Sequence, residues 1–294
     1  MQKPFLDLNK TKGISWFILS LIIGIINDVI MKFLGGNLSI YEVVFLRFFF
    51  GTIILIPFIF FNKKSFKTSR IFLHALRGSI LFLAIAAWCL GLNAGKLAVA
   101  TTINFTIPIF ILILAAKILD ETFSTIKIAV TIAGFIGIVI TINPTYSDFN
   151  ITSLMIVISA FLFASLDVIN KKFISDESML SMLFYSNLFA MLFSAVPGIY
   201  YWTSPDAKTL LLLFILGVGA NFILYCLLKS FSYIDVSAVS PYRYLELIFS
   251  ISLGYIFFKE KFDTTNWIGA SIIILSTLIM SYEYLFVRRS KKVS

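Results

Sequence analysis

Long apolar runs separated by short polar turns dominate the hydrophobic pattern of this 294-residue chain. A helix needs about 20 mostly apolar residues to cross a bilayer, and ten stretches fit that length. The pattern therefore predicts an all-α polytopic membrane protein with ten transmembrane helices. These predicted spans are residues 14–33, 40–61, 72–92, 97–117, 126–143, 152–172, 179–201, 209–231, 237–258 and 265–286.

The first of these stretches could also be compared with a signal peptide. Ile14 to Phe33 is longer than the apolar core of such a peptide, which is about 7–15 residues. No A-x-A cleavage site follows it. We therefore expect this stretch to be the first membrane span.

The second half of the chain repeats the first half at a constant shift of 139 residues. The segment DVIMK at residues 28–32 returns as DVINK at residues 167–171. A constant register without gaps predicts two copies of one unit, residues 1–147 and 148–294. Other identical pairs at this shift are Phe45 and Phe184, Gly78 and Gly217, Leu114 and Leu253, Glu121 and Glu260, Phe123 and Phe262, and Thr125 and Thr264.

Each copy contains five predicted spans, which is an odd number. The second copy therefore enters the membrane from the opposite side, and the two repeats are inverted about an axis in the membrane plane. Secondary transporters built in this way bind their substrates near the midplane, between the repeats. The repeat thus predicts two inverted five-helix units that alternate access to a central site.

Composition supports lipid as the solvent of this fold. Mean hydropathy is +0.96, and charged residues make up 13% of the chain, against about 25% in soluble domains. The net charge of +9 does not predict nucleic-acid binding, because no continuous basic stripe with interleaved aromatic residues is present. Fifteen lysines and arginines, Lys127 among them, fall on the side of the N-terminus, and five fall in the opposite loops. This asymmetry predicts that both termini are cytoplasmic.

The sequence predicts no enzyme, cofactor or metal centre. It contains no HExxH, GxSxG or Walker lysine loop. Cys89 and Cys226 lie in separate apolar runs without CxxC spacing, so we expect them to pack in the interior. The single histidine, His74, follows a basic loop and is expected at the membrane interface.

Two prolines mark interrupted helices. Pro108 lies in the fourth predicted span and Pro241 in the ninth, which are corresponding helices of the two repeats. Interrupted spans at matching positions point to a central binding site, although proline is also common in membrane helices in general. Four glycines are expected to allow close helix contact, namely Gly134, Gly137, Gly217 and Gly219.

Ionisable residues inside a membrane are costly and therefore candidates for function. Asp28 and Asp167 occupy equivalent positions, and each lies four residues before a lysine. One interpretation is an Asp–Lys pair near a helix end, with the lysine reaching the interface. The other is a pair of carboxylates that face one cavity across the pseudo-two-fold axis. The residues leave both interpretations open.

The ninth predicted span is the most polar one. Arg243 and Glu246 are three residues apart and share a helix face, so they could simply form an ion pair. Alternatively, Arg243 could hold a substrate carboxylate with its planar fork. Glu246, Asp28 or Asp167 would then face an ammonium or sulfonium group, which predicts a zwitterionic or cationic metabolite.

Aromatic and further basic residues complete the set of candidates. Tyr242 and Trp88 could stack on a purine or attract a cation to the ring face. Packing is the alternative for both, since the chain is rich in aromatic residues. Arg77, in the third predicted span, is expected to extend to the cytoplasmic interface.

The two five-span units resemble the EamA-like branch of the drug/metabolite transporter superfamily. In that family a turn of small residues leads into the fourth span of each unit, and an acidic residue follows that span. In the first unit, AVAT at residues 98–101 leads to Pro108 and then to Glu121. In the second, SAVS at residues 237–240 leads to Glu260.

Within that family, the length, spans and Ile/Phe/Lys/Asn-rich composition are similar to those of S-adenosylmethionine uptake transporters of intracellular bacteria. The resemblance implies a multi-pass protein of the bacterial inner membrane, with the lipid bilayer and a small-molecule substrate as its partners. It implies S-adenosylmethionine uptake, with exchange for S-adenosylhomocysteine as one mode. An exporter of amino acids or cationic drugs with the same fold is the alternative. The residues predict neither the coupling mode nor an oligomeric state.

Overall fold

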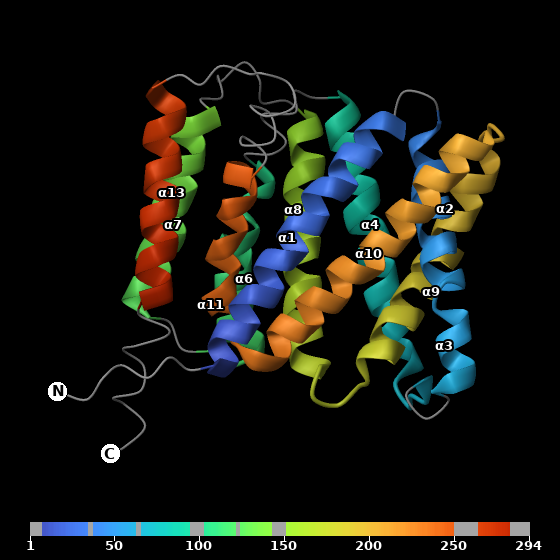
Figure 1. Cartoon of the computed structure of the whole chain (residues 1–294), viewed down its shortest axis with the longest axis horizontal. Helices are drawn as coiled ribbons and strands as arrows, with labels where there is room; N and C mark the ends of the chain where they lie inside the picture. The colour runs from blue at the N-terminus through green and yellow to red at the C-terminus, as the bar shows by residue number, and fades with distance from the viewer. Residues whose placement is uncertain are drawn as a thin grey trace.

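The computed structural model describes residues 8–34, 38–62, 66–94, 103–121, 124–142, 151–249 and 264–282, and every regular element in these ranges is helical. Figure 1 shows the helices standing side by side. The helices are α1 (Leu8–Leu34), α2 (Ile40–Ile53), α3 (Ile56–Phe61), α4 (Ile71–Ala94), α6 (Ile107–Ile118), α7 (Thr125–Ile142), α8 (Ile151–Phe173), α9 (Met179–Tyr200), α10 (Ala207–Tyr233), α11 (Val236–Val239), the 3₁₀ helix η3 (Ser240–Tyr244) and α13 (Thr264–Tyr282).

The prediction of an all-helical membrane protein is confirmed. Six helical stretches among the described residues are long and apolar enough to cross a membrane, and they coincide with the first, second, third, sixth, seventh and eighth predicted spans. Three shorter apolar helices, Ile107–Ile118, Thr125–Ile140 and Trp267–Tyr282, occupy the fourth, fifth and tenth. Of the ninth, the structure describes α11, η3 and the helical residues 245–249. The count of ten spans stays a prediction.

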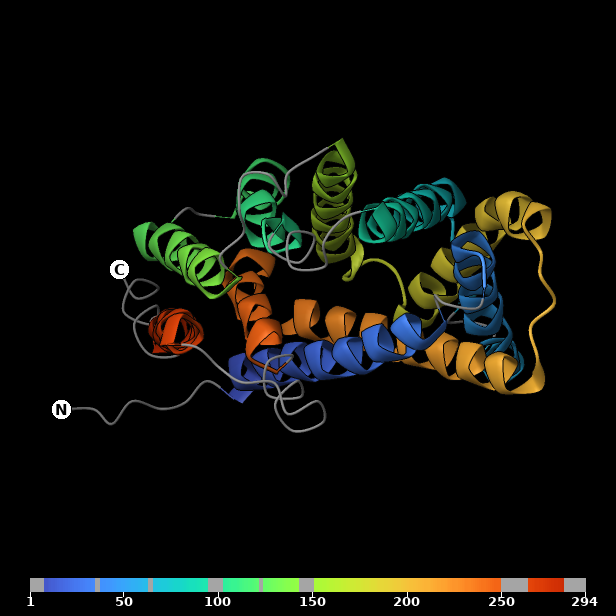
Figure 2. The same cartoon turned by 90° about the horizontal axis from the view of Figure 1, so that it is seen from above.

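The closest helix contacts join the first half of the chain to the second. Helix α1 packs along α10, α7 along α13, α4 along α8, and α2 along α9. Figure 2 shows α1 and α10 on one side of the molecule and α4 and α8 on the other, with α11 and η3 bridging them at one end. The two sequence repeats therefore share one interface, and a site on that interface receives residues from both.

Apolar side chains fill the interior and also cover the outer surface. The main buried cluster joins α1, α6, α8 and α10 through residues such as Phe17, Ile111, Val168 and Phe231. Outside it, Phe61 and Phe72 are more than 80% exposed. So much exposed apolar surface suits hydrocarbon rather than water.

Both prolines lie where a helix begins, as the sequence predicts for interrupted spans. Pro108 is in the first turn of α6, after a turn at residues 105–106. Pro241 is in the first turn of η3, which follows the four-residue helix α11. A first-turn proline leaves no intrahelical acceptor unpaired, because its missing N–H would have had no partner there. These breaks set the directions of the two segments.

The glycines predicted to allow close contact do so. A Cβ atom on Gly217 would lie 2.9 Å from the carbonyl oxygen of Arg47 and 2.9 Å from the backbone nitrogen of Gly51, both on α2. Gly134 lies against the ring of Tyr244. Close approach of the backbones is thus part of the packing between the repeats.

We expect Gly217→Ala to destabilise the folded protein by about 1–3 kcal/mol, because the α2 backbone must move away from the new methyl group. Heating the detergent-solubilised protein and measuring the fraction that remains monodisperse on gel filtration checks this. Gly24→Ala is the matched control, since a Cβ there meets nothing within 4 Å. Equal midpoints for the two variants would contradict the packing argument.

Candidate functional site

An ion pair between Arg243 and Asp167 lies inside the helix assembly. Arg243 Nη2 donates a hydrogen bond to Asp167 Oδ2 at 2.7 Å. Only 15% of the Arg243 side chain and 7% of the Asp167 side chain are exposed. Asp167 comes from α8, six residues before its end, and Arg243 comes from η3. The break after α11 thus brings a polar segment against a membrane-spanning helix.

The first repeat contributes an aromatic ring to this pair. The Arg243 guanidinium carbon lies 5.7 Å from the centroid of the Phe17 ring, on α1. The face of an aromatic ring attracts a cation at this distance. Arg243 Nε has no hydrogen-bond partner among the described residues. The Arg243 guanidinium group therefore retains one N–H donor that could bind a further acceptor.

A buried ion pair is poor evidence for a role in stability. Removing two charges from water costs several kcal/mol per ion, and well-packed apolar residues often serve stability equally well. In a membrane the cost makes function the default hypothesis. Chemically, a guanidinium beside a carboxylate can exchange partners with a zwitterion, because the ligand's anion replaces Asp167 and its cation replaces Arg243.

The Asp–Lys pair considered from the sequence does not form in the second repeat. Lys171 Nζ donates instead to the backbone oxygens of Phe231 and Ile234, at 2.6 and 2.8 Å. The lysine therefore binds carbonyl groups at the end of α10, where an ammonium is favoured by the helix dipole. Asp167 has Arg243 as its charged partner, rather than the residue one turn further along its own helix.

The other predicted site residues lie in different surroundings. Tyr242 is buried, and its hydroxyl contacts Ser281 Oγ of α13 at 2.5 Å, so this ring anchors η3. Trp88 is half-buried on α4 beside two apolar clusters. Glu246 is half-buried in the segment after η3. Asp28 lies on α1, and its side chain is outside the described residues. Their roles in binding stay predictions.

A second polar cluster surrounds Arg77. Arg77 and His74 were expected at the interface, and the side chains of both are completely buried within the protein. Arg77 Nε donates to Asn170 Oδ1 at 2.9 Å, and Nη1 donates to the carbonyl oxygen of Met182 at 3.3 Å. His74 Nε2 lies 3.3 Å from Glu177 Oε2. The arginine stays inside because acceptors from α8 and α9 surround it.

The Arg77 hydrogen bonds also fix the state of His74. Arg77 Nη1 lies 3.2 Å from His74 Nδ1. An arginine can only donate, so Nδ1 accepts this hydrogen bond, and Nε2 carries the proton that points toward Glu177. Arg77 thus ties α4 to α8 and α9.

Just outside the span, the turn between α8 and α9 is held by an exposed contact. Arg70 Nη1 donates to Asp176 Oδ2 at 2.8 Å. This hydrogen bond, together with one from Ser175, lowers the pKa of the Asp176 carboxyl below its ordinary value. Since both partners are exposed, water screens the pair and it contributes little to stability.

A third cluster, called the latch below, consists of Glu121, Lys127, Asp235 and Ser237. The sequence placed Lys127 among the charges outside the membrane, but its side chain is 2% exposed. It donates to Ser237 Oγ at 2.6 Å and lies 3.9 Å from both Glu121 Oε2 and Asp235 Oδ2. Lys127 lies in the first turn of the apolar helix α7, and this position could have predicted that its side chain is buried. The partners of Lys127 come from the other repeat and from the loop before α7.

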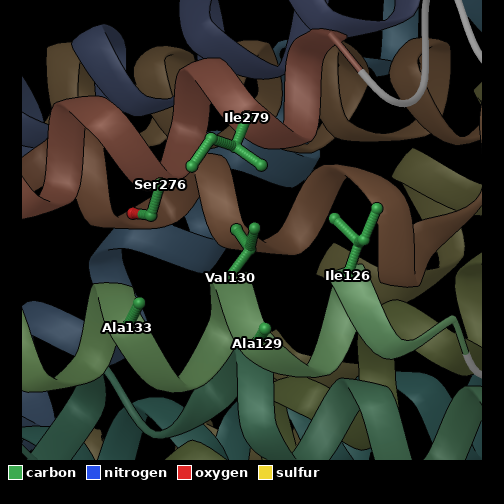
Figure 3. Close-up of a pocket in the computed structure, with 6 residues that line it drawn as sticks. All are labelled: Ile126, Ala129, Val130, Ala133, Ser276 and Ile279. Atoms are coloured by element: carbon green, nitrogen blue, oxygen red, sulfur yellow. The ribbon is translucent and has the colours of Figure 1, made fainter.

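A pocket of about 190 Å³ lies between α7 and α13, as Figure 3 shows. Five of its six lining residues are apolar, so it does not fit a charged metabolite. It is lined by Ile126, Ala129, Val130, Ala133, Ser276 and Ile279.

The last candidates are a metal site and the two cysteines, considered in the part of the chain that the structure describes. There, no group of three or more His, Cys, Asp or Glu side chains is placed to hold a metal ion. Cys89 and Cys226 are buried and not joined in a disulfide, so the expected packing role is confirmed.

Several known transporters are similar to this chain over most of its length. It is 46% identical over 280 residues to an S-adenosylmethionine uptake transporter of Rickettsia prowazekii, covering 94% of this chain and 95% of that protein. It is 47% identical over 272 residues to the protein of the same name from Rickettsia bellii, covering 92% and 94%. A riboflavin transporter of Vibrio cholerae is 28% identical over 235 residues, covering 79% of each chain.

A solved crystal structure shows the same fold. It superposes with a TM-score of 0.75 at 15% identity and covers 98% of this chain and all of that chain. The sequence pattern of the EamA-like transporter family matches residues 11–143 and again residues 150–282. The two matches begin 139 residues apart, which equals the shift of the sequence repeat. The chain is a multi-pass membrane protein that belongs to the EamA-like transporter family.

Proposed function

We propose that this chain is a secondary transporter that carries S-adenosylmethionine into a bacterial cell. The observation that carries this proposal is the 46–47% identity, over more than nine-tenths of the chain, to proteins named as S-adenosylmethionine uptake transporters. Similarity to the riboflavin transporter is much lower. The chain would lie in the inner membrane with both termini cytoplasmic. Its repeats, residues 1–147 and 148–294, would move around a site between them.

The Arg243–Asp167 pair supplies a chemical reason for this substrate. S-adenosylmethionine carries a carboxylate, an ammonium and a sulfonium group. Arg243 would bind the carboxylate with its planar fork, and Asp167 would face one of the cations. The exchange keeps each buried charge compensated, which lowers the cost of admitting a charged ligand.

Further contacts would complete the site. Asp28 occupies the position in the first repeat that Asp167 occupies in the second, and Glu246 follows Arg243 in the same segment. Either carboxylate would face the second cation of the ligand. Trp88 and Tyr242 would contact the purine or a cation through their rings.

Uptake of radiolabelled S-adenosylmethionine into bacterial cells that express the chain tests the proposal. We expect saturable uptake above cells with an empty vector, and inhibition by unlabelled S-adenosylhomocysteine. Riboflavin, amino acids and cationic dyes serve as further competitors. If the protein is present in the membrane and no uptake occurs, the proposal fails. Efflux of amino acids or dyes from loaded cells would then favour an exporter.

A further inference from the structure

Glu121 attaches the first repeat to the start of α11 in the second. Its two carboxylate oxygens accept hydrogen bonds from the backbone nitrogens of Val236 and Ser237, each at 3.1 Å. The Ser237 hydroxyl donates to the same carboxylate. Asp120 has a φ of 54°, in the left-handed region, and this turn after α6 directs Glu121 toward α11.

Charge compensation is complete within the latch and its neighbourhood. Lys127 contacts Glu121, Asp235 and Ser237, and Lys171 binds the carbonyl oxygen of Ile234, the residue before Asp235. Two carboxylates thus lie among two ammonium groups. Both Glu121 and Lys127 are less than 10% exposed at their side chains. The contact between these two side chains is stronger than its exposed equivalent, because little water competes with them, whereas Asp235 is 37% exposed.

The latch lies at the end of the molecule where α1 begins, which is the lower edge in Figure 1. At this end α6, α8 and α10 end and α7 and α11 begin. Gly13 of α1 packs directly against Ile234, in the link between α10 and α11. Four neighbouring segments therefore converge on one short link of the second repeat.

The latch also lies between this end and the Arg243–Asp167 pair. Ser237 precedes Arg243 by six residues along α11 and η3. At about 1.5 Å per residue in an α-helix and 2.0 Å in a 3₁₀ helix, the separation is roughly 11 Å. The latch is therefore nearer to this end of the molecule than Arg243 is.

The repeat does not carry the same set at the opposite end. At positions shifted by 139 residues, Glu121 corresponds to Glu260, but Lys127 corresponds to Asn266. Asp235 and Ser237 correspond to Lys96 and Ala98. The lysine, the aspartate and the serine hydroxyl of the latch are thus particular to one end of the transporter.

We propose that Glu121, Lys127, Asp235 and Ser237 form the cytoplasmic gate of this transporter, closed in the present conformation. This inference rests on the proposed function, which requires that the site open to the cytoplasm in each cycle. The contacts between the repeats at the latch must then break and re-form whenever substrate is released. A permanent contact would make them part of the scaffold instead.

Cross-linking distinguishes a gate from a scaffold. The double variant Glu121→Cys with Ser237→Cys is treated with a short bifunctional methanethiosulfonate, and S-adenosylmethionine uptake is measured before and after treatment. We expect treatment to stop uptake and a reductant to restore it. Each single variant and the parent chain, whose two cysteines are buried, are the controls and keep their uptake after treatment. Full uptake by the cross-linked protein would overturn the gate.

Failure of the proposed function is visible separately, because the parent chain would then show no uptake at all. If the double variant alone is inactive before treatment, cysteine labelling decides the question. Ser240, just inside the latch, is completely buried, so Ser240→Cys reports access from the cytoplasm. We expect Lys127→Gln to raise its labelling rate in inside-out vesicles roughly tenfold, within the range of typical coupling energies. Equal labelling rates with and without Lys127 would contradict the gate.

Discussion

Arg243→Ala is expected to abolish S-adenosylmethionine uptake and to leave folded protein in the membrane. Truncating one partner of a buried charge pair across a binding interface, here Arg243 with the substrate carboxylate, costs about 2–5 kcal/mol, which corresponds to a loss of roughly 30-fold to several thousandfold. The initial rate of uptake, divided by the amount of monodisperse protein on gel filtration, measures this loss. The physical reason is that the substrate carboxylate would lose the guanidinium group that binds it.

A double variant separates binding from structural compensation. Arg243→Ala together with Asp167→Ala removes both charges, so no unpaired charge remains in the interior. If Arg243 binds the substrate carboxylate, the double variant stays inactive. Recovery of uptake by the double variant would show that the pair serves folding alone. Decarboxylated S-adenosylmethionine should compete poorly with S-adenosylmethionine for uptake by the parent chain, because it lacks the carboxylate that Arg243 would hold.

Arg77→Ala is expected to remove most of the folded protein. The substitution leaves Asn170 Oδ1, His74 Nδ1 and the carbonyl oxygen of Met182 without the donor that joins them. Each buried acceptor that is left without its donor costs about 1–3 kcal/mol, so the three together approach the whole stability of many proteins. The yield of monodisperse protein after membrane solubilisation measures the effect.

Arg70→Ala is the matched control for Arg77. It removes an arginine of the same helical region, but one whose side chain is 42% exposed and whose partner Asp176 is also exposed. Exposed ion pairs contribute little, so the yield should stay close to that of the parent chain. Similar yields for the two alanine variants would mean that the buried network around Arg77 does not hold α4, α8 and α9 together.

The helices themselves could be predicted well from the sequence. In lipid every backbone group must find its partner within the protein, so a long apolar run leaves helix as the simple solution. Stretches such as Met179–Tyr200 and Ala207–Tyr233 therefore match the predicted spans within a few residues. The breaks at Pro108 and Pro241 were predictable for a similar reason, because proline removes a backbone donor.

The partners of the charged residues could not be predicted. Helical spacing suggested Glu246 for Arg243, because residues three apart share a face. The observed partner, Asp167, lies 76 residues away on another helix, and only the packing of α8 against the broken ninth segment brings them together. The same holds for Lys127 and Ser237, which are 110 residues apart. The burial of Arg77 among acceptors from α8 and α9 could not be predicted for the same reason.

Transport by the purified chain in liposomes tests the central claim most directly. Proteoliposomes are loaded with unlabelled S-adenosylmethionine, and entry of the radiolabelled compound is followed over time. The account predicts saturable entry that S-adenosylhomocysteine inhibits and that Arg243→Ala abolishes. Entry no faster than into protein-free liposomes, by protein that is monodisperse before reconstitution, would contradict the claim that this chain transports S-adenosylmethionine.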